Sequence, residues 1–314
     1  MANRLVPFSH DLETSLALAR AAVIARADPG ENVPDVVRFV EGQIRSGSAR
    51  GGLWMVDGRS VGVAVWDPPE PLGIAVRLSF LVPPSATPAA YRELLAAIDR
   101  AAGPVAFAAP LPGLSLGEEA EVLRSLAFAP FHRTEMRLPS SEPIPKLEVP
   151  AGIAVRLVRP GDRDFIARVH AAAFGGRFDR YLFLEDLDPA RDAARVVSSL
   201  WDGRWGEFLS GVSFVAESAG TPVGSTLVIR SEGRALIADV AVDPAFQHRG
   251  VGRSLMIATI QALRVQRELV IALAVTEENR PAFRLYERLG FVRAVGPDRR
   301  WYSTRVVPVA PGTD

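Results

Sequence analysis

The stretch ALIADVAVDPAFQHRGVGRSL, residues 235–255, decides the fold of this chain. Residues 236–242 are almost continuously apolar, as in a strand buried on both faces. From Val251 onward, apolar residues recur at helical spacing, so a buried helix is predicted to begin near Gly250. A helix start presents unpaired N–H groups and the positive end of the helix dipole, and glycines let an anion approach the backbone. The sequence therefore predicts a corner that suits a pyrophosphate.

Two other phosphate-binding patterns do not fit this corner. In a dinucleotide-binding βαβ unit the strand leads directly into the first glycine and a third glycine follows. Here seven residues separate the strand from Gly250, and Leu255 takes the third position. A P-loop needs Gly-Lys followed by Ser or Thr, which is absent after Gly252. One alternative stays open, because both glycines could serve only the close packing of a turn.

The composition is that of a folded chain without excess charge. Its 314 residues are 48% hydrophobic and 23% charged, which suits two globular domains. The formal net charge of +0 provides no field for nucleic acid or an anionic membrane, so we expect small-molecule or protein partners. Without cysteine there is no disulfide, thiolate metal site or cysteine nucleophile. No apolar run approaches the roughly 18 residues of a membrane span, and we expect a cytoplasmic protein without membrane contact.

A proline-rich segment separates two similar halves. Residues 139–150 contain four prolines, which deny backbone donors to a helix or strand. We therefore expect domains at 1–138 and 151–314, joined by a linker at 139–150. Similar segments in the same order predict a diverged internal repeat: RLV at 4–6 and 156–158, LWMVDGRSVGVAVW from 53 and FVAESAGTPVGSTLV from 214, and LRSLAFAPF from 123 and YERLGFVRA from 286.

The second half interleaves strands and helices. The pattern predicts strands at 153–158, 212–217, 222–230, 234–242, 269–275 and 301–307, and helices at 162–174, 250–267 and 281–289, with helical segments between 177 and 208. Such an order is typical of an α/β fold in which helices cover a mixed sheet.

The segment around Gly250 resembles motif A of the GNAT superfamily of acyl-CoA N-acyltransferases, whose signature is Gln or Arg, two residues, Gly, one residue, and Gly or Ala. Gln247, Gly250 and Gly252 match this signature after a strand with the V-x-V-x-P ending. The segment AVTEENRPAFRLYERLGF, residues 274–291, resembles motif B. The resemblance covers residues 151–307 and implies a tandem GNAT protein whose second domain is intact.

By this resemblance the corner holds acetyl-CoA or another short acyl-CoA, and no metal is expected. The strand backbone would pair with the pantetheine arm, and the amides at the helix start would hold the pyrophosphate. The implied donor-binding residues are Val240, Ala241, Val242, Gln247, His248, Arg249, Gly250, Val251, Gly252, Arg253 and Asn279. Arg249 could instead be a solvated surface arginine. No histidine side chain is assigned a chemical role.

Transfer of an acyl group from a thioester to an amine needs a neutral nucleophile and a proton for the thiolate. The resemblance assigns the proton donor to Tyr286, because a phenol with a pKa of about 10 stays protonated until a thiol of pKa about 8.5 ionises. Packing beside Leu289 is the other interpretation of Tyr286. The base is less well defined: family members often carry a glutamate where Ala238 stands. Asp239 is the candidate base. Strand alternation places it on the face opposite Ala238 and Val240. Its alternative role is to cap or brace a neighbouring element.

In the GNAT family the segment between the first two strands builds much of the acceptor pocket. Here it contains RFDRYLFLEDLDPARD from Arg177, in which Glu185 and Asp186 are the candidate ligands of an amine. An acidic helix end balanced by Arg177, Arg180 and Arg191 is the alternative.

The first half lacks the features expected of an acyltransferase. In the internal alignment Ala90 and Arg92 stand opposite Gly250 and Gly252, and Leu123 stands opposite Tyr286. We therefore expect this half to be degenerate and to act as scaffold, lid or acceptor wall.

The leading hypothesis is an N-acetyltransferase that moves an acetyl or other short acyl group from acyl-CoA to the primary amine of a small molecule, by direct transfer in a ternary complex, as a monomer or homodimer. A noncatalytic acyl-CoA-binding or regulatory module and a protein N-acetyltransferase are the alternatives.

Overall fold

The computed structural model describes residues 4–26, 33–66, 75–81, 87–108, 111, 113–231, 233–294 and 298–312. The chain forms two compact units. The first comprises Met1–Pro130 with Arg299–Pro308, and the second Phe131–Asp298 with Val309–Asp314. The chain thus leaves the first unit after Pro130 and returns to it near its end.

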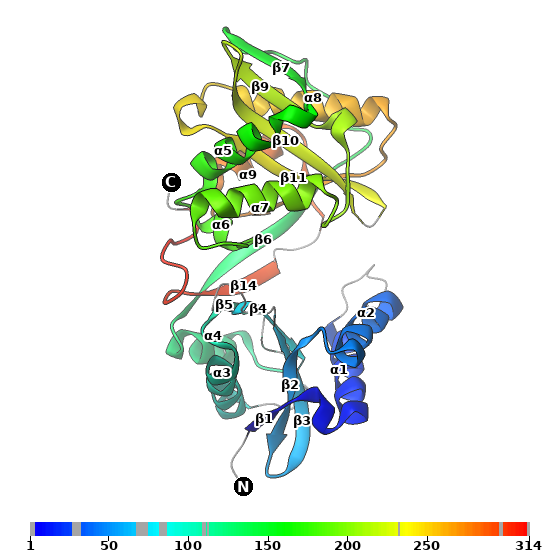
Figure 1. Cartoon of the computed structure of the whole chain (residues 1–314), viewed down its shortest axis with the longest axis vertical. Helices are drawn as coiled ribbons and strands as arrows, with labels where there is room; N and C mark the ends of the chain where they lie inside the picture. The colour runs from blue at the N-terminus through cyan, green and yellow to red at the C-terminus, as the bar shows by residue number, and fades with distance from the viewer. Residues whose placement is uncertain are drawn as a thin grey trace. The chain divides into compact units, whose positions relative to one another are not determined.

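In the first unit helices lie on both sides of a mixed sheet (Figure 1). Its elements are β1 (Arg4–Val6), α1 (Leu12–Arg26), α2 (Val33–Ser46), β2 (Arg50–Val56), β3 (Arg59–Trp66), β4 (Ala75–Leu81), α3 (Pro88–Ala102), β5 (Val105–Ala108), α4 (Leu116–Ser125) and the start of β6 (Phe128–Leu138). Neighbouring residues of β2 point to opposite faces. Leu53 and Met55 pack with α1 and α2, whereas Trp54 packs with α3 and α4.

The second unit repeats this order. Its elements are β7 (Ile153–Leu157), α5 (Arg163–Phe174), α6 (Phe178–Tyr181), α7 (Pro189–Trp201), β8 (Glu207–Phe208), β9 (Phe214–Ser218), β10 (Thr221–Ser231), β11 (Arg234–Val242), α8 (Val251–Val265), β12 (Ile271–Thr276), α9 (Arg280–Arg288) and β13 (Val292–Arg293). In its sheet the strand order is β6-β12-β11-β10-β9-β7. The expected α/β architecture with a mixed sheet is confirmed.

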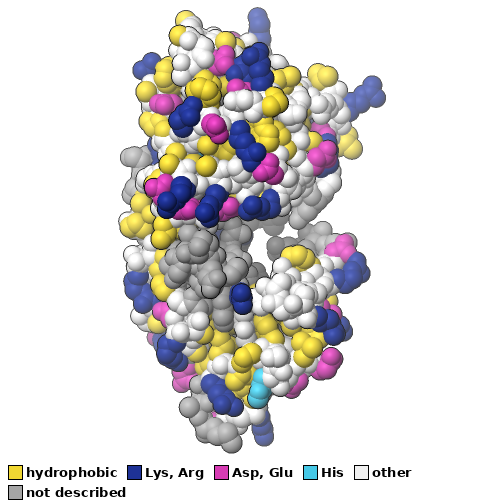
Figure 2. Space-filling model, viewed as in Figure 1, with side chains coloured by type: hydrophobic (Ala, Val, Ile, Leu, Met, Phe, Trp, Pro, Cys, Tyr) yellow, Lys and Arg dark blue, Asp and Glu magenta, His cyan; other side chains and the backbone are white. Residues whose placement is uncertain are grey.

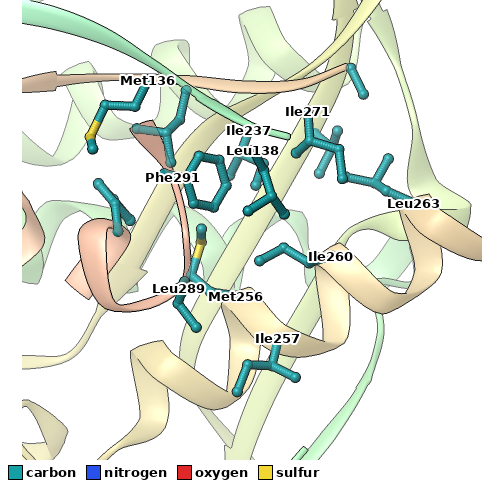
Figure 3. Packing of buried hydrophobic residues seen from close by; sticks show 14 of the residues in the cluster. Met136, Leu138, Ile237, Met256, Ile257, Ile260, Leu263, Ile271, Leu289 and Phe291 are labelled. Carbon is teal, nitrogen blue, oxygen red and sulfur yellow. The ribbon is translucent and has the colours of Figure 1, made fainter. Parts of the chain in front are cut away.

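Helix α8 packs on one face of this second sheet. Its side chains Met256, Ile257, Ile260 and Leu263 interlock with Ile237 of β11 and other strand residues, and each is fully buried or nearly so (Figure 3). Full burial of such a side chain stabilises the fold by about 1.5–3 kcal/mol. Helices α5 and α7 cover the other face (Figure 1). The predicted donor-binding corner between β11 and α8 therefore lies on a sheet that is packed on both faces.

The first residues of α3 and α8 correct the residue that the internal alignment placed opposite Gly250. Helix α3 is capped by Thr87 and α8 by Gly250, which lie as far apart in the chain as Leu126 and Leu289 do. Thr87, and not Ala90, is therefore the counterpart of Gly250. The alignment failed because fewer residues separate β4 from α3 than separate β11 from α8.

The two units exchange their last strands. Residues 133–138 of β6, which follow the helices of the first half, pair with the whole of β12 in the second unit. Strand β14 (Asp298–Ser303), which follows the second unit, pairs with β5 in the first. The last strand thus begins and ends a few residues before the expected 301–307.

The proline-rich segment 139–150, described throughout, contains no helix or strand and lies along α8. The Ser254 hydroxyl donates to the Glu148 carbonyl at 2.6 Å, and Gln261 Nε2 donates to the Pro145 carbonyl at 3.3 Å. Ile144 and Leu147 pack against the α8 core. The segment belongs to the second unit, and the domain bounds 1–138 and 151–314 remain a prediction.

Charged side chains of both signs are interspersed over the face shown in Figure 2. Within the described ranges, no helix combines the length and apolar character needed to cross a membrane.

A buried carboxylate fastens β14 to the first unit. Glu119 accepts hydrogen bonds from Trp301 Nε1 and Arg299 Nη2, both at 2.7 Å, and from the Leu111 amide at 3.0 Å. Glu119 is 3% exposed, so the buried Trp301 and Leu111 donors would lose their partner away from water if the carboxylate were removed, and the partly buried Arg299 would lose its ion pair.

We expect Glu119→Ala to lower the free energy of unfolding by about 3–5 kcal/mol, because it leaves the Arg299 charge without its buried partner. Denaturant unfolding followed by tryptophan fluorescence measures the change. The matched control is Glu121→Ala on the same helix, whose carboxylate pairs with Arg92 at the surface and whose loss should matter little. Equal effects of the two substitutions would contradict this account.

Candidate active site

The parallel strands β11 and β12 separate along their length. They pair only at their starts, Ala235 with Ile271 and Leu236 with Ala272. Beyond that point β10 continues to support β11 as far as Val242, and β6 supports β12 as far as Thr276. Residues 237–242 and 273–276, all described, thus face each other without pairing. The opening offers backbone N–H and C=O groups to a ligand.

Helix α8 begins beside this opening with a group of free amides. Gly250 caps the helix at a φ of 86°, with no side-chain cap, and His248 also has a positive φ of 58°. The amides of residues 248–253 donate to no residue that the structure describes. Successive amides in such a turn form a concave anion-binding site at the positive end of a helix. Residues 248–250 are exposed, so an anion can reach it.

The two glycines meet different requirements. Gly250 is needed for its left-handed backbone, which other residues adopt only with strain. A Cβ at Gly252 would lie 3.5 Å from Val242 Cγ2 and 3.8 Å from Leu285 Cδ2, which is ordinary contact. Position 252 therefore has room for a methyl group.

The Gln247 side chain positions the loop. Its Nε2 donates to the Val242 carbonyl at 2.9 Å, and its Oε1 accepts from Arg177 at 3.3 Å. The loop is thereby tied to the end of β11. Arg249 lies 5.5 Å from the centroid of the Phe246 ring, and Arg253 lies 3.8 Å from Glu148.

Helix α9 brings Tyr286 to the opening. Asn279 caps this helix by accepting from the Ala282 amide at 3.3 Å, and its Nδ2 donates to Asp179 at 3.0 Å. The Thr276 hydroxyl donates to the other oxygen of Asp179 at 2.6 Å. Asn279 thus links the end of β12, α6 and α9, and its amide contacts are largely used within the protein.

Tyr286 is 8% exposed. Burial raises the pKa of its phenol, and the charges of Asp179 and Asp239 raise it further, against a smaller opposing effect of Arg133. The phenol therefore stays protonated throughout the neutral range, as a proton donor requires. The sequence placed Asp179 only among the carboxylates of the acceptor segment, and its contacts with Thr276 and Asn279 were not predicted because these partners lie about a hundred residues further along.

A β-bulge turns Asp239 toward α5. The register of β11 shifts between Ile237 and Asp239, so Ala238 has no partner on β10. Ala238 packs on the α5 side, and Asp239 accepts from His170 Nδ1 of α5 at 3.0 Å. Both residues therefore face α5, and the expectation that Asp239 faces away from Ala238 was wrong. Strand alternation fails because a bulge inserts one residue.

The Asp239–His170 contact is the main feature of the site that the sequence did not reveal. Burial alone would lower the pKa of His170, but the charge and hydrogen bond of Asp239, with a contribution from Asp192, raise it overall. The other Asp239 oxygen, Oδ2, is buried without a hydrogen-bond partner. A lone histidine on a helix carries no pattern that could have indicated this contact.

Glu185 and Asp186 lie in the segment just before α7, where arginines already surround them. Glu185 accepts from the Ser199 hydroxyl at 2.8 Å and lies 3.4 Å from Arg204. Asp186 accepts from the Asp188 amide and pairs with Arg191 and Arg195, so hydrogen bonds and the arginines lower its pKa. Their role in acceptor binding remains a prediction. These contacts fit the alternative, in which the carboxylates are balanced by nearby arginines.

The first unit differs at the corresponding corner. Thr87 caps α3 by accepting from the Ala90 amide at 3.3 Å, and Pro88 removes a further donor. The parallel strands β4 and β5 pair as far as Ala108, the last residue of β5. Both features support, as a proposal, a first half that binds no acyl donor.

A strand pair opened beside a free helix start, with the buried phenol of Tyr286, is the arrangement that the resemblance to acyl-CoA-dependent transferases implies. The model of the acetyltransferase (GNAT) family matches residues 181–291. The mycothiol acetyltransferase of Thermomonospora curvata is 32% identical over 265 residues, which cover 80% of this chain and 81% of that protein. The chain belongs to the GNAT acetyltransferase family, which confirms the expected family and enzyme class.

Solved structures extend the likeness to both units. A GCN5-related N-acetyltransferase from Sphaerobacter thermophilus aligns with a TM-score of 0.60 at 19% identity, covering 96% of this chain and 93% of that one. A tandem GNAT protein from the clavulanic acid biosynthesis pathway aligns with a TM-score of 0.53 at 17% identity and covers 96% of both chains. At such identities the likeness concerns the fold, and it confirms the tandem arrangement.

We expect Asn279→Ala to lower the free energy of unfolding by about 1–2 kcal/mol, because α9 loses its cap and the link to Asp179. Asn279→Ser keeps a good cap and should recover about half of that loss. Chemical denaturation measures both. If the alanine variant were as stable as the parent, Asn279 would not be holding α9.

Proposed function

We propose that the second unit transfers an acetyl group from acetyl-CoA to the primary amine of a small molecule by direct transfer in a ternary complex. The observation that carries this proposal is the open strand edge of β11 beside the free amides of residues 248–253. The name of the Thermomonospora curvata relative, mycothiol acetyltransferase, supports acetyl as the transferred group and a small molecule as the acceptor.

The residues at the opening fit such a donor. The backbone of Val240, Ala241 and Val242 would pair with the amides of the pantetheine arm, as an added strand does. The amides from His248 through Gly250, Val251 and Gly252 to Arg253 would hold the pyrophosphate, with Arg249 and Arg253 adding positive charge. Gln247 and Asn279 keep the two walls in place.

Tyr286 holds the proton that the departing thiolate needs. Acetyl-CoA supplies an activated acetyl group and a thiolate leaving group. Burial and two carboxylates make the Tyr286 phenol a weak acid, and a sulfur held beside it would become more basic for the same reasons. The pKa values of the Tyr286 phenol and the CoA thiol therefore stay close enough for the phenol to give its proton to the thiolate. Asp239 acts on the amine side, and Glu185 and Asp186 remain candidates for binding the acceptor.

We expect Gly252→Asp to weaken acetyl-CoA binding by at least about tenfold, because it places a carboxylate beside the pyrophosphate site. Gly252→Ala is the matched control, because position 252 has room for a methyl group, and it should bind much as the parent does. Isothermal titration calorimetry measures both affinities. Unchanged binding by the aspartate variant would place the donor elsewhere.

We expect Tyr286→Phe to lower kcat by about 10²–10⁴-fold while the Kd of acetyl-CoA stays the same, because only the hydroxyl is lost. Release of CoA thiol can be followed with a chromogenic thiol reagent across a panel of small amines, and the chain contributes no background because it has no cysteine. If the parent bound acetyl-CoA but acetylated no amine, it would instead be a noncatalytic acyl-CoA-binding module.

A further inference from the structure

We propose that His170 takes the proton from the acceptor amine and that Asp239 is the positioning residue that holds the imidazole for this task. The proposal rests on the proposed function of the second unit and assigns its missing base. It replaces the absent strand glutamate with a pair of residues from α5 and β11.

The geometry of the pair leaves one nitrogen available. An ionised carboxylate can only accept, so the contact with Asp239 places the proton on His170 Nδ1. Nε2 of the neutral ring then carries the lone pair, and it bonds to no residue within the described ranges. The ring packs against Phe174, with centroids 4.7 Å apart, which fixes its plane. Nε2 is therefore the ring nitrogen with a lone pair that can accept a proton.

The bulge at Ala238 makes the pair possible. In a regular strand, Asp239 would lie on the same face as Ile237, which packs with α8. It would then be unable to contact α5. The inserted residue instead directs it to α5, while Val240 packs in the core with α8. The free oxygen Oδ2 of Asp239 is buried on the same strand that borders the opening. It can attract the ammonium form of the acceptor before the proton moves.

The groups facing His170 come from three elements. They are Asp239 on β11, Asp192 on α7, which is itself paired with the buried Arg180 of α6, and Phe174 on its own helix. Tyr286 on α9 faces Asp239 in turn. The carboxylates outweigh burial and raise the pKa of His170. A raised pKa makes the imidazole a stronger base toward an alkyl ammonium of pKa about 10.

The protons balance in this scheme. An ammonium gives one proton to His170 Nε2, and the neutral amine attacks the thioester carbonyl. The new C–N bond forms, the C–S bond breaks, and the Tyr286 phenol gives its proton to the sulfur. The second proton of the nitrogen restores Tyr286, and His170 releases the first to solvent.

Two measurements test the proposal on the full chain. The four histidines can be assigned by single substitutions, and their ring signals followed by NMR against pH. We expect His170 to titrate above the usual value of about 6.5 and its pKa to fall in Asp239→Asn. This readout needs neither donor nor acceptor.

The second measurement is kcat/KM for the best amine against pH. It should rise with pH through the pKa of His170, because the base must be neutral. We expect His170→Asn, which can still donate to Asp239, to lower kcat/KM by about 10²–10⁴-fold and to remove that inflection, with the Kd of acetyl-CoA unchanged. His10→Asn, in the first unit, is the control and should behave as the parent does.

Three outcomes would overturn the proposal. An unchanged pH profile in His170→Asn would show that the imidazole is only a brace. Strong loss in Asp239→Asn without loss in His170→Asn would make Asp239 the base. A parent protein that binds acetyl-CoA but acetylates no amine would instead refute the proposed function, and the role of His170 would fall with it.

Discussion

The separation of β11 from β12 is the constraint on which the rest of the structure depends. The two strands pair at Ala235 and Leu236 and then diverge, yet each keeps a full ladder on its other side, with β10 or with β6. The opening therefore costs few hydrogen bonds within the sheet, although an open edge inside a sheet is normally unfavourable. A ligand that carries amides can form hydrogen bonds with the unpaired backbone groups at this edge. The start of α8 lies at the same end, where the crevices of α/β sheets bind their ligands.

The electrostatics of the opening follow from two carboxylates, the partly buried Asp179 and the buried Asp239. Asp179 is held by Thr276 and Asn279, and Asp239 by His170. Both keep the phenol of Tyr286 protonated, and Asp239 also favours a charged imidazole. One shared carboxylate thus raises the pKa of both the proton donor and the proton acceptor. The arrangement requires the bulge at Ala238, since a regular strand would leave Asp239 and His170 on different sides.

The sequence predicted what local patterns determine. The helix at 250–267 is observed at Val251–Val265, and the helix at 281–289 at Arg280–Arg288, because apolar periodicity and the cap residues are contiguous signals. The free amides at Gly250 followed from the same short stretch. The bulge, the Asp239–His170 contact and the exchange of strands could not be predicted in this way. They depend on which distant segments meet, and a histidine 69 residues from its partner leaves no local trace.

The exchange of β6 and β14 affects how the protein is made. The sheet of the first unit is completed by β14, which follows all the strands of the second unit in the chain. During synthesis, the strand β5, already paired with β4, therefore waits for its other neighbour until the second unit as far as Asp298 has been translated. Domains of a chain ordinarily fold one after another from the N-terminus, but here the first unit can be finished only after the second has been translated.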